Sequence, residues 1–130
     1  MDSCFAWHDR GRGMIIAVDF DDTIARSVFP TILGEVPMAK EVINRLRGDG
    51  HYIIVNTCRA GKDLLDAVNW MLDVGISFDR INDNHPENIR LYQNNTRKIN
   101  ADVYIDDRNV GGFMGWEDAY NWIKDKMENT

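Results

Sequence analysis

The 130-residue chain has few cysteines, no long apolar run and no excess of positive charge, and each absence excludes a class of protein. Cys4 and Cys58 are its only two cysteines, which is too few for a secreted disulfide scaffold and too scattered for a zinc ribbon. No apolar run approaches the roughly 20 residues that a membrane span needs, and residues 1–13 lack the apolar core of a signal peptide. We therefore expect a cytoplasmic protein with no membrane partner.

The balance of charges limits the partners further. The chain carries 21 acidic and 15 basic residues, which gives a formal net charge of −6 and a pI near 4.9. Because an acidic surface repels polyanions, long nucleic acids are not expected as partners. A small anionic substrate is still compatible with this charge, since a bound metal ion can reverse the field at one site.

The sequence favours a single domain. Hydrophobic residues make up 44% of the chain, which is enough for a compact core, and the chain shows no internal repeat, low-complexity segment or linker. We expect one domain over residues 14–130. Residues 1–13 are expected to form a poorly ordered extension that precedes it.

Short apolar runs alternate with helical patterns along the chain. Continuous apolar runs, typical of strands buried on both faces of a parallel sheet, occupy residues 14–18, 52–55 and 103–105. Apolar stripes at helical spacing occupy residues 38–46, 64–72 and 116–127. This alternation predicts an α/β fold, with a three-layer, doubly wound, Rossmann-like parallel sheet.

Two segments lack these patterns. Residues 24–36 are rich in turn-forming residues and are expected to form a loop. Residues 78–100 are polar and contain many asparagines, and we expect a short strand near residues 78–82 within them.

Polar residues follow each apolar run. In a parallel sheet, ligands bind beyond the carboxyl ends of the strands, so these residues are the candidate site. They are Asp19, Asp21, Thr57, Arg59, Asp106 and Asp107, with Lys98 ahead of the third run. Acids, a hydroxyl group and cations are thus expected at one edge of the sheet.

Three other kinds of site do not fit these residues. A calcium loop would need glycine and glutamate where the chain has Ile24 and Pro30. A phosphate-binding P-loop would need glycine at Asn56 and a hydroxyl residue at Asp63. A cysteine phosphatase built on Cys58 would need an arginine six positions later, where the chain has Leu64.

Four stretches resemble, in order, the motifs of the haloacid dehalogenase (HAD) superfamily. "VDFDDT" resembles the first motif, D-x-D-x-T after a hydrophobic strand, and "IIVNT" resembles the second. Lys98 resembles the third-motif lysine, although it lies closer to the acids than in many members, and "VYIDD" resembles the fourth motif. The segment "TRKINADVYIDDR" is similar to short bacterial and phage HAD hydrolases and to deoxyribonucleotidases.

The resemblance implies a Mg²⁺-dependent phosphomonoester hydrolase that forms an aspartyl-phosphate intermediate. Asp19 would be the nucleophile and a metal ligand. Asp21 would be the general acid and base, and its backbone carbonyl a metal ligand. Neighbouring carboxylates are expected to raise the pKa of Asp21, and the metal ion to lower it. Thr57 and Lys98 would bind the phosphoryl oxygens. Arg59 would contact the substrate or form a surface ion pair.

Some assignments stay open at this point. Asp106 and Asp107 would complete the metal site, one directly and one through water, and the sequence does not say which. The lysine role falls to Lys98 or to the adjacent Arg97. Asp22 is interpreted as a support for the loop after the first strand.

The spacing of the motifs leaves no room for a sizeable cap domain, so we expect a capless enzyme with an open site. Residues 24–36, with Phe29 and Pro30, would form its gate, and a second subunit could cover it. The expected substrate is a small phosphorylated molecule such as a nucleotide or a sugar phosphate. The alternatives are a receiver-like phosphorylated switch and a catalytically inactive binding module of the HAD fold.

Overall fold

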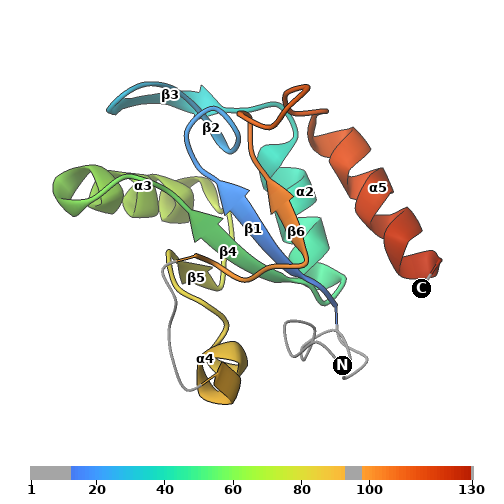
Figure 1. Cartoon of the computed structure of the whole chain (residues 1–130). Helices are drawn as coiled ribbons and strands as arrows, with labels where there is room; N and C mark the ends of the chain where they lie inside the picture. The colour runs from blue at the N-terminus through green and yellow to red at the C-terminus, as the bar shows by residue number, and fades with distance from the viewer. Residues whose placement is uncertain (1–12, 93–97, 130) are drawn as a thin grey trace.

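A four-stranded parallel sheet is the centre of the fold (Figure 1). The computed structural model describes residues 13–92 and 98–129, apart from the side chain of Tyr92. Across the sheet the strands are β5 (Arg80–Ile81), β4 (Tyr52–Asn56), β1 (Ile15–Asp19) and β6 (Val103–Ile105). Taken in chain order, the arrangement is third, second, first, fourth, which is the strand order of a Rossmann-like sheet.

The central strand β1 pairs with a strand on each of its edges and so fixes their register. It pairs with β4 over all five of its residues, so that Asp19 lies opposite Asn56. On its other edge it pairs with β6, where Val18 lies opposite Ile105. Because strands cover both edges of β1 and apolar groups cover both faces, its sequence is a continuous apolar run. Asp19 is the first residue to reach the carboxyl edge.

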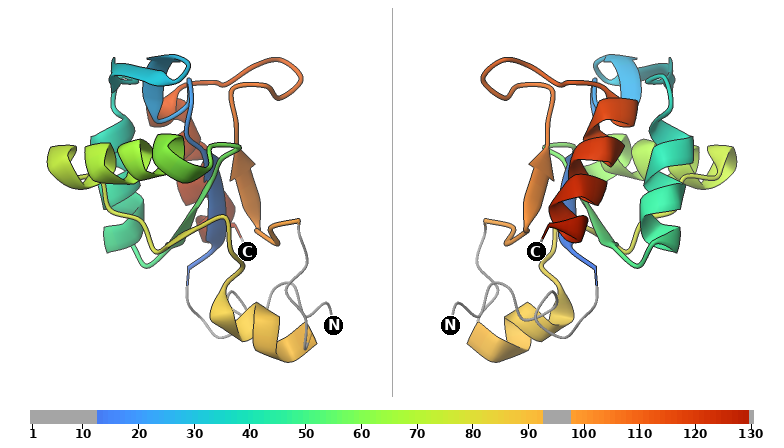
Figure 2. Two further views of the ribbon diagram at one scale, coloured as in Figure 1. Left: turned by 90° about the vertical axis from the view of Figure 1, so that its left-hand side faces the viewer. Right: turned by 90° about the vertical axis from the view of Figure 1, so that its right-hand side faces the viewer.

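Three helices pack on one face of the sheet (Figure 2). They are α2 (Ala39–Gly48), α3 (Gly61–Val74) and α5 (Trp116–Glu128). The core residues that join them to the sheet include Ile16, Val18, Val42, Ile43, Leu46, Ile53, Val55, Ala67, Met71, Ile105, Trp116 and Ile123. The three predicted helices and the three strands predicted from the short apolar runs are thus confirmed, since the apolar patterns matched the buried faces.

The opposite face has a thinner cover. Its core consists of Ile15, Ala17 and Ile54 from the strands and Ile99 from the segment before β6, with Tyr52 and Ala101 partly buried beside them. Helix α4 (Pro86–Tyr92) is short and lies beyond the amino ends of the strands (Figure 1). The α/β class is confirmed. The prediction of three layers, with helices on both faces of the sheet, is not confirmed: among the described residues, this second face is covered by the segment before β6 and not by a long helix. No described helix is long and apolar enough to cross a membrane.

The predicted loop over residues 24–36 is wrong, because most of it forms a β-hairpin. Strands β2 (Ala25–Val28) and β3 (Thr31–Glu35) pair antiparallel, with an irregularity at Arg26 and Ser27, and lie above the carboxyl ends of the sheet (Figure 1). Four of their nine residues are apolar, but two of these, Val28 and Leu33, are exposed. The apolar residues therefore do not follow the alternation that predicts a half-buried strand. The short strand expected near residues 78–82 is confirmed by β5, whereas α4 was missed in the polar stretch.

The described fold begins one residue earlier than the expected boundary between residues 13 and 14. Gly13 is buried, and the backbone N–H of Met14 donates a hydrogen bond to His51 Nδ1 at 2.9 Å. A Cβ atom on Gly13 would lie 2.5 Å from the carbonyl oxygen of Gly50 and 2.8 Å from His51 Nδ1. Gly13 therefore belongs to the packed fold. Residues 1–12, the rest of the expected extension, lie outside the described residues.

We predict that Gly13→Ala destabilises the protein by about 1–3 kcal/mol, the usual cost of overpacking, because the contact is with backbone atoms. Denaturant unfolding measures the change. The matched control is Gly48→Ala in α2, where a Cβ atom meets nothing within 4 Å. That variant should keep the wild-type stability or gain up to about 1 kcal/mol from helix propensity. Equal stability of the two variants would contradict the placement of Gly13.

Candidate functional site

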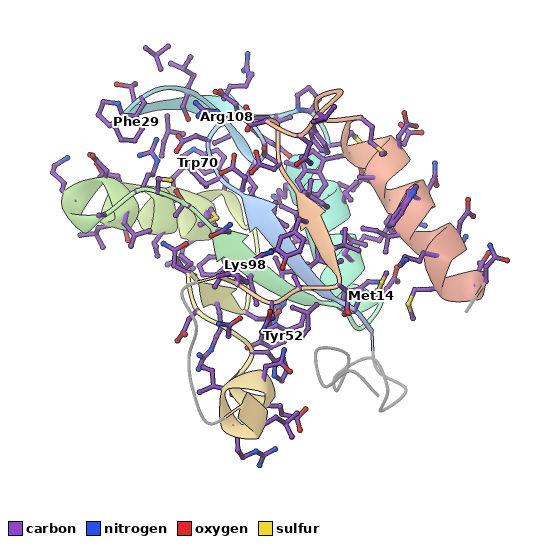
Figure 3. The ribbon with its side chains drawn as sticks, in the orientation of Figure 1. Met14, Phe29, Tyr52, Trp70, Lys98 and Arg108 are labelled. Atoms are coloured by element: carbon purple, nitrogen blue, oxygen red, sulfur yellow. The ribbon has the colours of Figure 1, made fainter. Side chains whose placement is uncertain are left out.

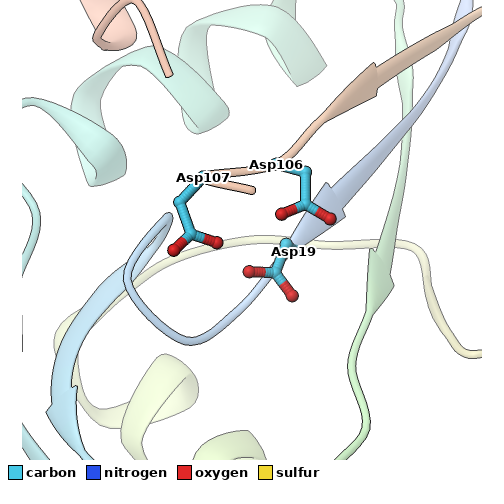
Figure 4. A group of neighbouring side chains, drawn as sticks. All are labelled: Asp19, Asp106 and Asp107. Atoms are coloured by element: carbon cyan, nitrogen blue, oxygen red, sulfur yellow. The ribbon is translucent and has the colours of Figure 1, made fainter. Parts of the chain in front are cut away.

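Three aspartates converge at the carboxyl edge of β1 and β6 (Figure 4). Asp19 is the last residue of β1, and Asp106 and Asp107 directly follow β6. One carboxylate oxygen from each lies within 4.8 Å of the other two, and all three residues are partly buried. The parallel pairing of β1 with β6 produces this convergence, since both chains leave the sheet at neighbouring positions. The structure thus brings together three of the four predicted metal ligands.

Thr23 joins the two segments that carry the acids. It is fully buried, and its hydroxyl group donates a hydrogen bond to Asp19 Oδ2 at 3.3 Å and accepts one from the backbone N–H of Asp107 at 3.0 Å. Its carbonyl oxygen accepts a hydrogen bond from Trp116 Nε1 at 2.8 Å. Helix α5 therefore holds the turn in place. The sequence placed Thr23 in the first motif without predicting a role for its side chain. It indicated Trp116 only as part of an apolar helical stripe.

The crowding of negative charge changes the protonation of Asp19. Burial, the charges of Asp106 and Asp107, and a hydrogen bond with Asp107 raise the pKa of Asp19 to about 7, and the Thr23 hydroxyl lowers it only in part. Three carboxylates this close retain a proton unless a cation replaces it. Carboxylate oxygens are the ligands that Mg²⁺ prefers, so the donor set fits the predicted cofactor.

Asn82 holds the predicted phosphoryl-binding residue Thr57 in place. The Thr57 backbone N–H donates to Asn82 Oδ1 at 2.8 Å, and Asn82 Nδ2 donates to the Thr57 carbonyl oxygen at 2.9 Å. Asn82 directly follows β5 and has a left-handed backbone conformation. The side-chain amide thereby continues the pairing of β4 and β5 by one residue. Asn82 is one of several asparagines in residues 78–100, and the sequence did not single it out.

Asp21 follows Asp19 by two residues and is bound by Arg59. Arg59 Nη2 donates to Asp21 Oδ1 at 2.7 Å, and Arg59 Nε donates to Asp21 Oδ2 at 3.0 Å. The prediction that Arg59 forms a surface ion pair is wrong in its location, because Arg59 is only 2% exposed. A role in substrate contact stays a prediction. Cys58, beside it, is exposed and free.

The pKa of Asp21 moves opposite to the prediction. Burial raises it, but the hydrogen bonds that Asp21 accepts from Arg59 and from the Ser27 side chain, with the charge of Arg59, outweigh burial and lower the pKa overall. The acids expected to raise the pKa of Asp21 raise that of Asp19 instead. Asp22 accepts a hydrogen bond from Ser27 N–H and donates its own N–H to the Ala25 carbonyl, as expected of a loop support.

Lys98 is exposed in the segment that precedes β6 (Figure 3). The next residue, Ile99, packs against Ile15 and Ala17, so Lys98 lies on the thinly covered face of the sheet. Alternation along β1 places Asp19 on the same face as these two residues. The lysine role of Lys98 stays a prediction, and Arg97 lies outside the described residues.

Comparison with known proteins found one informative similarity. No protein-family model matches the chain, and no curated protein matches it. Among solved structures, a conserved protein from Bacteroides thetaiotaomicron is similar over 88% of this chain and 92% of its own, with 40% sequence identity and a TM-score of 0.79.

The raised pKa of Asp19 predicts how pH affects stability. An aspartate in an unfolded chain has a pKa of about 4, so between about pH 4 and pH 7 the folded state binds more protons than the unfolded state. Stability contributed by this group is therefore lost as pH rises through that window. Asp19→Asn cannot ionise. Without divalent cations it should melt at a higher temperature than wild type at pH 8, and the difference should disappear near pH 4.

Thermal unfolding in the presence of a chelator measures this effect. Asp73→Asn, which removes an exposed charge on α3, is the matched control and should show no such pH-dependent gain. Adding Mg²⁺ at pH 8 should raise the melting temperature of wild type more than that of Asp19→Asn. If Asp19→Asn were less stable than wild type at pH 8 without cations, the repulsion described above would not exist.

Proposed function

We propose that this chain, which belongs to the same family as the conserved Bacteroides thetaiotaomicron protein, is a hydrolase. Its proposed activity is the Mg²⁺-dependent hydrolysis of phosphomonoesters, as in enzymes of the HAD type. The observation that carries the proposal is the cluster of Asp19, Asp106 and Asp107 at the carboxyl edge of the sheet, within 4.8 Å of one another. Asp21 and Thr57 lie at the same edge, in the order that the motifs imply. This combination supplies a nucleophile, a proton carrier and a cation site together.

Asp19 is the nucleophile in this proposal. Its carboxylate oxygen forms a bond to phosphorus while the bond from phosphorus to the leaving oxygen breaks, which yields an aspartyl-phosphate and an alcohol. Asp21 gives its proton to the leaving oxygen. Water then attacks the phosphorus of the aspartyl-phosphate, Asp21 takes the proton of that water, and phosphate leaves with Asp19 regenerated. The reaction thus consumes one water and returns both carboxyl groups to their starting states.

The cofactor would be held by Asp19, Asp106, Asp107 and the backbone carbonyl of Asp21. Mg²⁺ bound there supplies charge neutralisation for the anionic phosphoryl group. Thr23 keeps Asp19 and Asp107 in register through its hydroxyl group. Thr57 is the proposed first contact to the phosphoryl oxygens, because it directly follows Asn56, the residue that pairs with Asp19. Lys98 is the proposed second contact to the phosphoryl oxygens.

The site suits a small phosphorylated substrate such as a nucleotide or a sugar phosphate. The segment between Thr23 and α2 holds only the hairpin of β2 and β3, so the proposed enzyme has no sizeable cap and its site is open. A second subunit would be one way to cover it. The acidic surface argues against long nucleic acids. In this proposal the protein works in the cytoplasm.

The strand order argues against the receiver-like alternative. A receiver domain has the flavodoxin-like order, in which the first strand lies between the second and third strands of the sheet. Here β1 lies between β4 and β6, the second and fourth strands of the sheet in chain order. A receiver also needs a phosphoacceptor aspartate after its middle strand, and β4 is followed by Thr57. The experiment below distinguishes the other alternative, a catalytically inactive binding module, from a hydrolase.

We predict that the purified protein releases phosphate from 4-nitrophenyl phosphate in the presence of Mg²⁺ and that a chelator stops the release. Asp19→Asn should lower the rate by at least about 10³-fold, because the covalent step is removed. Colorimetric detection of 4-nitrophenolate follows the reaction. Asp73→Asn, which changes the same charge at an exposed position of α3, should keep the wild-type rate.

Two results would contradict the proposal. A fully active Asp19→Asn protein would remove the nucleophile assignment. A wild-type protein that becomes phosphorylated once by a small phosphodonor but releases no phosphate would indicate a switch rather than a hydrolase. For the substrate, a screen over nucleotides, sugar phosphates and short phosphorylated oligonucleotides then ranks the candidates by kcat/KM.

A further inference from the structure

Asn82 continues a very short strand with its side chain. β5 ends at Ile81, and the backbone N–H of the next residue, Asn82, still donates a hydrogen bond to the carbonyl oxygen of Val55 in β4 at 2.9 Å. Beyond that point the side-chain amide makes the contacts. The N–H of Thr57 donates to Asn82 Oδ1 at 2.8 Å, and Asn82 Nδ2 donates to the Thr57 carbonyl oxygen at 2.9 Å. The backbone of Thr57 is therefore held at two points.

Asparagine is the residue type that this arrangement needs. The backbone of Asn82 is left-handed, with a φ of 52°, and asparagine is one of the few residues besides glycine that adopt this conformation readily. Its amide carries both a donor and an acceptor, so it can match the N–H and the C=O of one residue at the same time. An aspartate would lack the donor, and a glycine would lack the side chain.

The hydroxyl group of Thr57 is oriented by a second neighbour. Thr57 Oγ1 accepts a hydrogen bond from the backbone N–H of Arg59 at 3.1 Å. Among the residues that the structure describes, no acceptor takes the hydroxyl proton of Thr57. A hydroxyl oxygen that accepts one hydrogen bond can still donate its own O–H, and an anion at the site can receive it. Thr57 is thus arranged as a hydrogen-bond donor.

The position of Thr57 gives this donor a use in the proposed reaction. Thr57 directly follows Asn56, which pairs with Asp19, the proposed nucleophile. Asn82 itself is exposed, so water can replace both of its hydrogen bonds to Thr57 and their net contribution to stability is small. The two-point contact is therefore better explained by the position that it gives to Thr57 than by the stability of the fold.

We infer that Asn82 is a positioning residue, which holds the Thr57 hydroxyl group where it donates a hydrogen bond to a phosphoryl oxygen while Asp19 attacks the phosphorus. The inference rests on the proposed function and adds one residue to it. With 4-nitrophenyl phosphate, the bond from Asp19 to phosphorus forms, and the bond to the leaving oxygen breaks. The bonding electron pair departs with 4-nitrophenolate, which needs no proton. Asn82 acts on this step only through Thr57.

The inference makes the Thr57 hydroxyl group the informative variable. If Asn82 acts through this group, its removal also removes the effect of Asn82 on the rate. Thr57→Val keeps the shape of the side chain and lacks the hydroxyl group. A general structural role of Asn82 would instead lower the rate by the same factor with and without the hydroxyl group. A double-mutant cycle between Asn82 and Thr57 separates the two cases.

The test compares kcat and KM for 4-nitrophenyl phosphate with Mg²⁺ in wild type, Asn82→Gly, Thr57→Val and the double variant. Glycine adopts the left-handed backbone without strain, so Asn82→Gly removes the amide alone. We expect Thr57→Val to lower kcat about 10²-fold, the usual effect of losing one donor to a developing charge. Asn82→Gly should lower kcat about 10-fold, because the donor is displaced rather than removed. The double variant should match Thr57→Val within about twofold.

The chain offers a matched control in a second amide bridge. Asn44 Nδ2 donates to the carbonyl oxygen of Gly75 at 2.8 Å, and the N–H of Ser77 donates to Asn44 Oδ1 at 2.9 Å. This bridge joins α2 to the segment before β5, whereas Asn82 follows the other end of that strand. Asn44→Ala should keep the wild-type kcat and KM. Thermal unfolding of each variant measures its stability separately.

The outcomes separate the inference from the proposed function. If wild type does not hydrolyse 4-nitrophenyl phosphate with Mg²⁺, the proposed function fails, and the inference with it. If wild type is active, the inference alone is overturned when Thr57→Val or Asn82→Gly keeps the wild-type kcat. It is also overturned when Asn82→Gly lowers kcat equally in both backgrounds. If Asn82→Gly does not fold, Asn82→Ser, whose side chain is too short for the bridge, replaces it in the cycle, and an equal loss in both backgrounds overturns the inference.

Discussion

The hydrogen-bond ladder on both edges of β1 is the constraint on which the rest of the structure depends. It fixes β4 on one side and β6 on the other, so that the residues that follow all three strands emerge at the same edge of the sheet. This register brings Asp19 close to Asp106 and Asp107 and places Thr57 at the same edge. The side-chain contacts then adjust positions that the backbone has already set.

The adjustments have a common pattern, in which a polar side chain performs a task usually given to backbone. Thr23 joins two segments through its hydroxyl group, and Asn82 continues the pairing of β4 and β5 with its amide. Each interaction lies directly beside an aspartate or threonine of the candidate site. Side chains thus join the segments at the carboxyl edge of the sheet, where the candidate site lies.

The electrostatics of the site divides its two proposed catalytic acids. Without a bound cation, the raised pKa of Asp19 favours its protonated form, whereas the hydrogen bonds from Arg59 favour the ionised form of Asp21. The proposed reaction starts from the opposite states, so a cation must displace the proton of Asp19, and Asp21 must gain a proton before the leaving group departs. The two residues are separated by a single position in the sequence. Their environments differ because Asp19 ends a strand, and the turn after it directs Asp21 towards the connection that carries Arg59.

The parts of this picture that the sequence could predict are those with a local signal. The apolar runs and stripes indicated the strands of the sheet and three helices, because each pattern matches one buried face. The candidate acids could be placed at one edge because parallel strands end there. The apolar residues of β2 and β3 do not alternate regularly, and Val28 and Leu33 among them are exposed. The environment of Arg59 includes Phe29 and Asp21 from other segments. Such features arise from tertiary contacts, which a pattern in one segment does not reveal.

The order in which the chain can assemble follows from the contacts of Thr23. Its partners Asp107 and Trp116 lie 84 and 93 residues later in the chain, so these are among the most non-local contacts of the fold. Loop closure over such distances is slow compared with the formation of local helices. During synthesis, the acids of the first strand therefore remain apart from those of the last strand until almost the whole domain has emerged. The repulsive cluster forms when the rest of the core can hold it.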